Sequence, residues 1–195
     1  MKFIGFYDYT VILTYMSLLS AMTGMFLSSE GRFTGAVVCL VICGICDAFD
    51  GTVARTKKNR TPDEKSFGIQ IDSLCDAVSF GVFPALLCYH LGMETVAGFV
   101  ILSVFALCGV IRLAFFNVLE SKRQQTEGGS NKFYRGLPIT TSSIILPLVY
   151  MLRPLLPGKV FLSLLYVVMA ATAFLFILDF SMKKPDWSKV LTRSR

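Results

Sequence analysis

Six apolar stretches, each close to the length that crosses a lipid bilayer, set the strongest limit on how this chain folds. An α-helix rises about 1.5 Å per residue, so about 20 residues span the ~30 Å hydrocarbon core. Hydrophobic residues make up 54% of the 195 residues and charged residues only 16%, too few to cover a soluble domain of this size. The predicted spans are Tyr9–Leu27, Phe33–Arg55, Phe67–Tyr89, Thr95–Leu119, Leu137–Leu152 and Val160–Phe180. The sequence therefore predicts an all-α integral membrane protein with six transmembrane helices, built as a single domain over residues 1–195.

The two ends of the chain are predicted to lie at the membrane surface. Residues 1–8 are too few to span and mix aromatic side chains with Lys2, which is typical of a short amphipathic helix at the interface. Residues 182–195 form a basic tail. Most Lys and Arg residues fall in loops that share one side of a six-span protein, and the positive-inside rule makes that side cytoplasmic. We expect a multi-pass protein of the cell membrane with both termini in the cytoplasm. The net charge of +6 reflects this topology, and no nucleic-acid binding is expected.

Four aspartates interrupt the second and third apolar stretches. A carboxylate in hydrocarbon costs about 2.5–3.5 kcal/mol on insertion scales, so these positions need a chemical reason. Residues three or four apart share a helix face, which places Asp47 beside Asp50 and aligns Gly68, Asp72 and Asp76 on the next helix. If the two helices pack antiparallel, the four carboxylates converge just below the cytoplasmic surface. Any one of them alone would equally suit a structural hydrogen bond.

Four converging carboxylates repel one another unless a cation neutralises them. Oxygen ligands without His or Cys favour a hard divalent ion, Mg²⁺ or Mn²⁺, with Ca²⁺ as an alternative bound ion. Gly51 and Gly68 let a ligand or helix approach the backbone closely. Arg55 offers a planar set of donors for a phosphate oxygen. The inferred substrate is therefore a phosphate ester at the membrane surface.

The spacing of these residues resembles the signature of the CDP-alcohol phosphotransferase family. The pattern D-x2-D-G-x2-A-R, then twelve residues, then G-x3-D-x3-D fixes eight positions. They are Asp47, Asp50, Gly51, Ala54, Arg55, Gly68, Asp72 and Asp76. The resemblance implies a homodimer, a site open to the cytoplasm and a CDP-linked lipid donor. It also implies that all four aspartates are candidate metal ligands, that Asp76 is the catalytic base, and that Gly51, Ala54, Arg55 and Gly68 bind the CDP phosphates.

Two later stretches resemble the serine-using branch of the same family, the phosphatidylserine synthases. They are R-L-A-x-F-N, from Arg112 to Asn117, and F-x-x-G-L-P, from Phe133 to Pro138. Phe115 and Thr140 depart from the residues common at those positions in the branch. The resemblance implies CDP-diacylglycerol and L-serine as substrates, in the lipid bilayer.

Three residues of these stretches are candidates for binding serine or phosphate: Arg112, Asn117 and Arg135. An arginine inside a span should face a polar cavity. The alternatives are an ion pair between Arg112 and a motif aspartate, a helix-capping role for Asn117, and a solvated loop position for Arg135.

Two rival functions remain open on sequence grounds. Arg112, Lys132 and Arg135 could serve a phosphorylated acceptor, as in a phosphatidylglycerophosphate synthase. Intramembrane acids also mark ion pathways, as in a divalent-cation transporter, although these acids gather toward one face of the membrane.

The six cysteines lie in predicted spans, and Cys43 and Cys46 form a C-x-x-C pair. A zinc site needs further ligands, and the chain has a single histidine, His90. We expect the cysteines to be small apolar packing residues.

Overall fold

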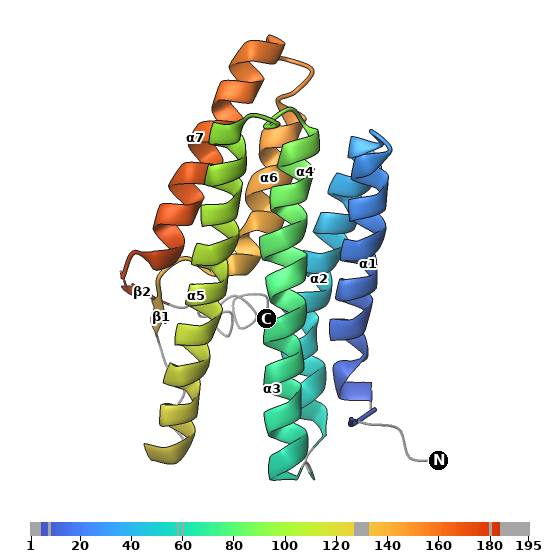
Figure 1. Ribbon diagram of the computed structural model, residues 1–195. Helices are drawn as coiled ribbons and strands as arrows, with labels where there is room; N and C mark the ends of the chain where they lie inside the picture. The colour runs from blue at the N-terminus through green and yellow to red at the C-terminus, as the bar shows by residue number, and fades with distance from the viewer. Residues whose placement is uncertain are drawn as a thin grey trace, which may run out of the picture.

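The computed structural model describes residues 5–7, 9–57, 59, 61–126, 133–179 and 181–183. Within this part, the chain is a bundle of helices (Figure 1). Seven α-helices of the described chain form six segments, because two of them, α3 and α4, are continuous. The α-helices are α1 (Ile12–Ser29), α2 (Phe33–Thr56), α3 (Pro62–Asp76), α4 (Phe83–His90), α5 (Val96–Thr126), α6 (Ser142–Met151) and α7 (Gly158–Ile177). A π-helical segment, η2 (Ala77–Val82), joins α3 and α4 into one continuous rod. Two 3₁₀ turns, η1 (Tyr9–Val11) and η3 (Ile139–Thr141), precede α1 and α6.

Five of the segments are long and apolar enough to cross a membrane. They are Tyr9–Ser29, Phe33–Val53, Pro62–His90, Val96–Leu119 and Gly158–Ile177. The predicted multi-pass helical architecture is therefore confirmed. The predicted span Leu137–Leu152 is shorter than expected, since its helical part is Ile139–Met151 and begins with a 3₁₀ turn.

Two short strands were not anticipated. β1 (Phe133–Arg135) and β2 (Ser181–Lys183) pair antiparallel, with Tyr134 opposite Met182. This pairing ties the loop before α6 to the chain that follows α7. Of the predicted interfacial helix, residues 5–7 are not helical, and the remaining positions lie outside the described residues. Most of the predicted tail lies outside them too.

The π-helical segment has a local cause in Pro84. Proline has no backbone N–H, so the carbonyl of Phe80, four residues earlier, loses its normal helical partner. The hydroxyl of Ser142 on α6 donates to that carbonyl at 3.1 Å. Ser79 in the same segment is hydrogen-bonded to Ser17 of α1 at 3.3 Å. Buried hydroxyls from two other helices thus stabilise the irregular turn, as is required where water is excluded.

Small residues bring the helices close together around this rod. A Cβ added at Gly24 would lie 2.2 Å from the ring of Phe83, and one at Gly44 would lie 2.2 Å from Ser143 Oγ. These contacts join α1 to α4 and α2 to α6 without space for a larger side chain. All six cysteines are buried free thiols, consistent with the predicted packing role.

Candidate active site

The carboxyl-terminal half of α2 and the length of α3 bring the four aspartates together. Asp47, Asp72 and Asp76 line one pocket of about 320 Å³. Asp50 lies close enough to Asp72 on the next helix for the two carboxyl groups to influence each other's charge. Asp76 is the most buried of the four, with 9% of its surface exposed, and it interacts electrostatically with the other three. The two helices therefore present their acidic faces to each other.

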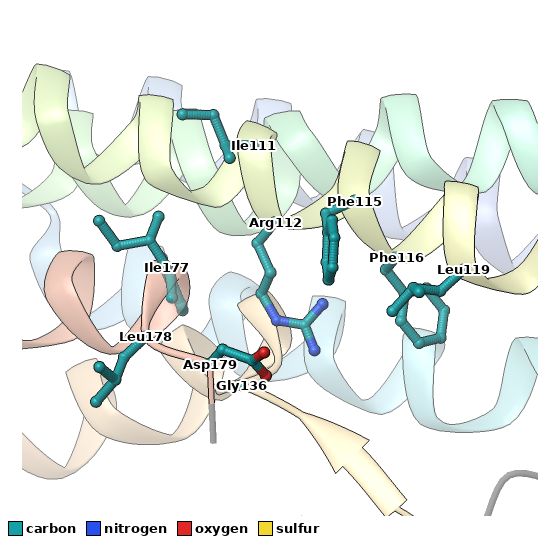
Figure 2. Close-up of a pocket in the computed structure, with 10 residues that line it drawn as sticks. Ile111, Arg112, Phe115, Phe116, Leu119, Gly136, Ile177, Leu178 and Asp179 are labelled. Atoms are coloured by element: carbon teal, nitrogen blue, oxygen red, sulfur yellow. The ribbon is translucent and has the colours of Figure 1, made fainter. Parts of the chain in front are cut away.

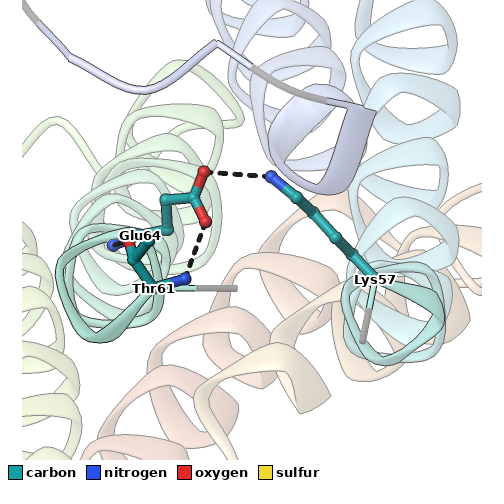
Figure 3. A network of polar contacts seen from close by, with 3 residues as sticks. All are labelled: Lys57, Thr61 and Glu64. Carbon is teal, nitrogen blue, oxygen red and sulfur yellow. Dashed lines mark hydrogen bonds and ion pairs between the residues drawn. The ribbon is translucent and has the colours of Figure 1, made fainter. Parts of the chain in front are cut away.

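The connection between α2 and α3 is fixed by a capping box (Figure 3). The Thr61 hydroxyl accepts from the backbone N–H of Glu64 at 3.2 Å, and the Glu64 carboxylate accepts from the backbone N–H of Thr61 at 2.9 Å. Lys57, at the end of α2, donates to the other Glu64 oxygen at 3.0 Å. This network satisfies the first backbone donors of α3 and links the helix start to α2. It therefore helps to set the register in which the two acidic faces meet.

Helix α3 separates two pockets that meet at Asp72. The first, of about 190 Å³, lies toward α1 and α2 and contains Asp50. Its other lining residues are Thr10, Val11, Thr14, Gly51, Lys65, Gly68 and Ile69. The second is the pocket of Asp47 and Asp76, which lies toward α5 and η3. Asp72 and Ile69 line both, so the acidic cluster opens on two sides.

The carboxylates fit a hard divalent cation. Asp72 Oδ1 is buried and has no hydrogen-bond partner among the described residues, so its lone pairs are available to an ion. In the described part of the chain, no group of three or more His, Cys, Asp or Glu side chains is arranged to hold a metal by itself. Mg²⁺ sites in proteins commonly use only one or two carboxylates, with waters and substrate phosphates as the remaining ligands.

The predicted phosphate-binding residues are placed only in part. Gly51 and Gly68 line the pocket of Asp50, together with the exposed Lys65. The side chains of Ala54 and Arg55 lie outside the described part of the structure, as does the side chain of Arg135. In the sequence, Lys65 counted only as one of the basic loop residues that orient the chain in the membrane. No sequence pattern marked the buried residues Thr10 and Thr14 as part of a site.

Arg112 lies between the acidic pocket and a second, more apolar pocket. Figure 2 shows the second pocket. Arg112 is 8% exposed, its Nε donates to the carbonyl of Leu137, and its guanidinium lies 5.6 Å from the centre of the Phe116 ring. Both pockets include Arg112 and Phe116 in their walls. The apolar pocket, of about 210 Å³, runs between α5 and α7. In Figure 2 the guanidinium points toward the side of the pocket that holds Asp179.

Asn117 does not cap a helix, because α5 continues to Thr126. Its side chain lines the acidic pocket and contacts Ser73 of α3. The Nδ2 group donates to Ser73 Oγ at 2.8 Å, and Ser73 Oγ lies 3.2 Å from Asn117 Oδ1. Ser73 was missed in the sequence because an uncharged serine beside Asp72 carries no signal of its own.

The described structure thus brings the motif aspartates of α2 and α3 and the buried Arg112 of α5 together around two adjoining pockets. The chain belongs to the CDP-alcohol phosphatidyltransferase family, whose model matches residues 9–178.

The chain is also similar to individual curated proteins of known name. The chain is 34% identical over 151 residues to the CDP-diacylglycerol–serine O-phosphatidyltransferase of Saccharomyces cerevisiae, covering 71% of this chain and 53% of the relative. It is 34% identical over 140 residues to the archaetidylserine synthase of Methanothermobacter thermautotrophicus, covering 70% and 56%. It is 31% identical over 148 residues to the CDP-diacylglycerol–serine O-phosphatidyltransferase of Helicobacter pylori, covering 75% and 58%. The chain thus spans little more than half the length of these relatives. No solved structure matches it.

Proposed function

We propose that the protein is a CDP-diacylglycerol–serine O-phosphatidyltransferase, which transfers the phosphatidyl group of CDP-diacylglycerol to the hydroxyl of L-serine. The products are phosphatidylserine and CMP. The observation that carries this proposal is the acidic cluster with two openings, because the reaction must bring a nucleotide-linked donor and a small polar acceptor to the same phosphorus atom. The names of the similar proteins from yeast and Helicobacter pylori support serine as the acceptor.

The pocket of Asp50 suits the CDP part of the donor. Gly51 and Gly68 allow close approach, and Lys65 supplies a cation for the diphosphate. The buried hydroxyls of Thr10 and Thr14 provide hydrogen-bonding groups on the α1 side. We also assign Ala54 and Arg55 to this side from their place in the motif.

The pocket of Asp76 suits the acceptor. Asp76 takes the proton from the serine hydroxyl, and the serine oxygen forms a bond to the phosphorus that carries diacylglycerol. The bond from that phosphorus to the CMP oxygen breaks, and CMP leaves. Arg112 provides a planar set of donors for the serine carboxylate, and Asn117 an amide for the same ligand. We keep Arg135 as a further candidate on this side.

Asp47, Asp50, Asp72 and Asp76 would hold Mg²⁺ or Mn²⁺ together with the substrate phosphates, with Ca²⁺ as another ion that the oxygens accept. A divalent ion bound there supplies charge neutralisation on the diphosphate and on the departing CMP. The chain's own contribution is to hold the carboxylates on two helices, which the Lys57–Glu64 ion pair links at the start of α3.

The proposed function also suggests how the chain crosses the membrane, binds the lipid tail and assembles. We propose that Ile139–Met151, with the turns that flank it, forms a sixth crossing, because an even number keeps both termini on the cytoplasmic side. Residues 1–195 then form one catalytic domain with its site facing the cytoplasm. The apolar pocket beside Arg112 offers a surface for an acyl chain of the donor. We also expect a homodimer, which cross-linking in native membranes would test.

The decisive experiment is an acceptor panel with the purified protein in lipid nanodiscs. Radiolabelled CDP-diacylglycerol and Mn²⁺ are supplied with L-serine, glycerol 3-phosphate or water, and CMP release is measured. We expect release that depends on serine and disappears with EDTA. An Asp63→Asn variant is a matched surface control on α3 and should behave as wild type, since Asp63 is exposed and lies in the first turn.

Two results would overturn the proposal. Release with glycerol 3-phosphate but not serine would indicate a phosphatidylglycerophosphate synthase. Passage of Mn²⁺ across the membrane without any CMP release would indicate a transporter. An ether-linked CDP-lipid in the same panel tests which donor backbone is used, because one relative is an archaetidylserine synthase.

A further inference from the structure

A polar link joins the acidic helix α3 to the helix that carries Arg112. Asn117 Nδ2 donates to Ser73 Oγ at 2.8 Å, and the same hydroxyl lies 3.2 Å from Asn117 Oδ1. Both side chains are half-buried. Ser73 directly follows Asp72 and precedes Asp76 by three residues, so the link attaches to the same turn as the carboxylates. It therefore lies at the point where the acidic faces and α5 meet.

The link lies on one side of α3 only. Asn117 lines the pocket that contains Asp76 and Arg112, whereas the pocket of Lys65 and Gly68 lies on the α1 and α2 side. A change in the distance between α3 and α5 therefore alters the first pocket and leaves the second largely intact. In a site whose reacting atoms must be aligned, a displacement of about 1 Å lowers the rate by up to about 10²-fold.

The chemistry of the pair leaves the amide of Asn117 able to bind a ligand. An amide nitrogen has two N–H donors and its oxygen has two lone pairs. One N–H is used on Ser73, so one donor and one lone pair remain for a ligand in the pocket. This combination complements a zwitterion, since an N–H donates to a carboxylate and Oδ1 accepts from an ammonium group. The amide is held in place because Ser73 contacts it through both ends.

We propose that Ser73 is a positioning residue that acts through Asn117. It fixes the width of the acceptor pocket and orients the Asn117 amide toward a zwitterionic amino acid. This inference rests on the proposed function and goes beyond it, because it assigns acceptor recognition to a residue that is not one of the eight fixed positions of the motif. Ser73 itself does not have to touch the substrate.

The test compares Ser73→Ala with Ser66→Ala, a matched change at an exposed position of the same helix. Steady-state CMP release gives kcat and separate KM values for serine and CDP-diacylglycerol. We expect Ser73→Ala to lower kcat/KM for serine about tenfold, near the upper end of the effect of one lost hydrogen bond. The KM for CDP-diacylglycerol should stay within about twofold of wild type. Ser73→Thr, which keeps the hydroxyl, should recover most of the loss.

A double variant shows whether the two residues act as one unit. The kcat/KM for serine of the double variant Ser73→Ala with Asn117→Ala should equal that of Asn117→Ala alone. Once the Asn117 amide is gone, removing the Ser73 hydroxyl costs nothing further. Donor binding is followed separately by the rise in melting temperature that CDP-diacylglycerol and Mn²⁺ produce, which should persist in every variant. If Ser73→Ala does not fold, Ser73→Cys, which replaces the hydroxyl by a weak donor and acceptor, carries the same comparison of serine and donor KM.

Three outcomes would refute the inference while leaving the proposed function standing. The first is a Ser73→Ala variant whose kcat/KM for serine equals that of Ser66→Ala. The second is an equal loss of kcat/KM for serine and for CDP-diacylglycerol. The third is a double variant in which the losses of kcat/KM from the two changes add. By contrast, a wild-type protein with no turnover of serine would refute the proposed function itself.

Discussion

Replacing Gly44 by alanine tests how closely the fold and the acidic site depend on one helix contact. A Cβ at this position would lie 2.2 Å from Ser143 Oγ and 2.8 Å from Ser143 Cβ. An ordinary van der Waals contact begins at 3.4 Å, so the new methyl group is about 1 Å too close. Ser143 is buried on α6, and Gly44 is one helical turn before Asp47 on α2. Helix α6 must therefore shift, or Ser143 must change rotamer.

Either response disturbs a hydrogen bond next to the acidic pocket and lowers the free energy of unfolding. Ser143 Oγ donates to the carbonyl of Thr140 at 2.7 Å, and Thr140 lines the acidic pocket. Overpacking of this kind typically destabilises a protein by about 1–3 kcal/mol. At about 2–4 °C per kcal/mol for a chain of this size, the melting temperature should fall by about 2–12 °C. Movement of Thr140 by about 1 Å should also lower turnover by up to about 10²-fold.

The assay follows thermal unfolding in detergent with a thiol-reactive dye, since all six cysteines are buried until the protein unfolds. Gly35→Ala is the matched control, because its Cβ would meet only the end of the flexible Leu27 side chain, at 3.0 Å. Gly44→Ala combined with Ser143→Gly removes both clashing atoms and should regain part of the stability. If Gly44→Ala has the same melting temperature and turnover as Gly35→Ala, the close contact of α2 with α6 does not limit stability or activity, and the reasoning is refuted.

Three further changes probe the site and its supporting turn. Asp76→Asn should lower kcat by at least about 10²-fold, because a general base typically contributes about 10²–10⁴-fold, while the KM for CDP-diacylglycerol changes little. A kcat equal to wild type would exclude Asp76 as the base. Arg112→Lys should raise KM for serine about tenfold, because lysine lacks the Nε donor that contacts the Leu137 carbonyl and the planar guanidinium. An unchanged KM would mean that positive charge alone suffices. Gly136→Ala should destabilise the fold by about 1–2 kcal/mol, because Gly136 has a φ of +69° and a Cβ there would lie 3.2 Å from the Leu178 carbonyl oxygen. Thermal unfolding checks this, and a melting temperature equal to wild type would contradict it.

The features that follow a regular period were predictable from sequence. Long apolar runs identified the five long spans, because a membrane helix must satisfy its backbone internally and present apolar side chains outward. Helical spacing aligned Asp72 with Asp76 on one face, and the expectation that the two acidic helices pack antiparallel brought Asp47 to them, as the shared pocket confirms. The arginine in the middle of the predicted span Thr95–Leu119 also indicated a polar cavity, and Arg112 lines one.

The features that depend on distant partners were not predictable. The pairing of Ser73 with Asn117 joins residues 44 positions apart, and the Ser142 contact with the Phe80 carbonyl joins residues 62 apart. Neither partner carries a charge or a periodic pattern that would mark it. The strand pair of β1 with β2 likewise joins two short segments that have no alternating pattern long enough to notice. Such contacts arise only when the helices are already packed.

The π-helical segment also fixes the rotational phase of one half of the long rod against the other. Each α-helical residue advances about 100° around the axis, whereas the i→i+5 bonding of Ala77–Val82 winds the chain more slowly, so a change of this segment to regular α-helical winding would turn all of α4 relative to α3. The carboxylates of α3 would keep their orientation, while the ring of Phe83 would leave the notch at Gly24. The winding of this short stretch therefore holds the two halves of the rod in phase, although no single side chain in it does chemistry.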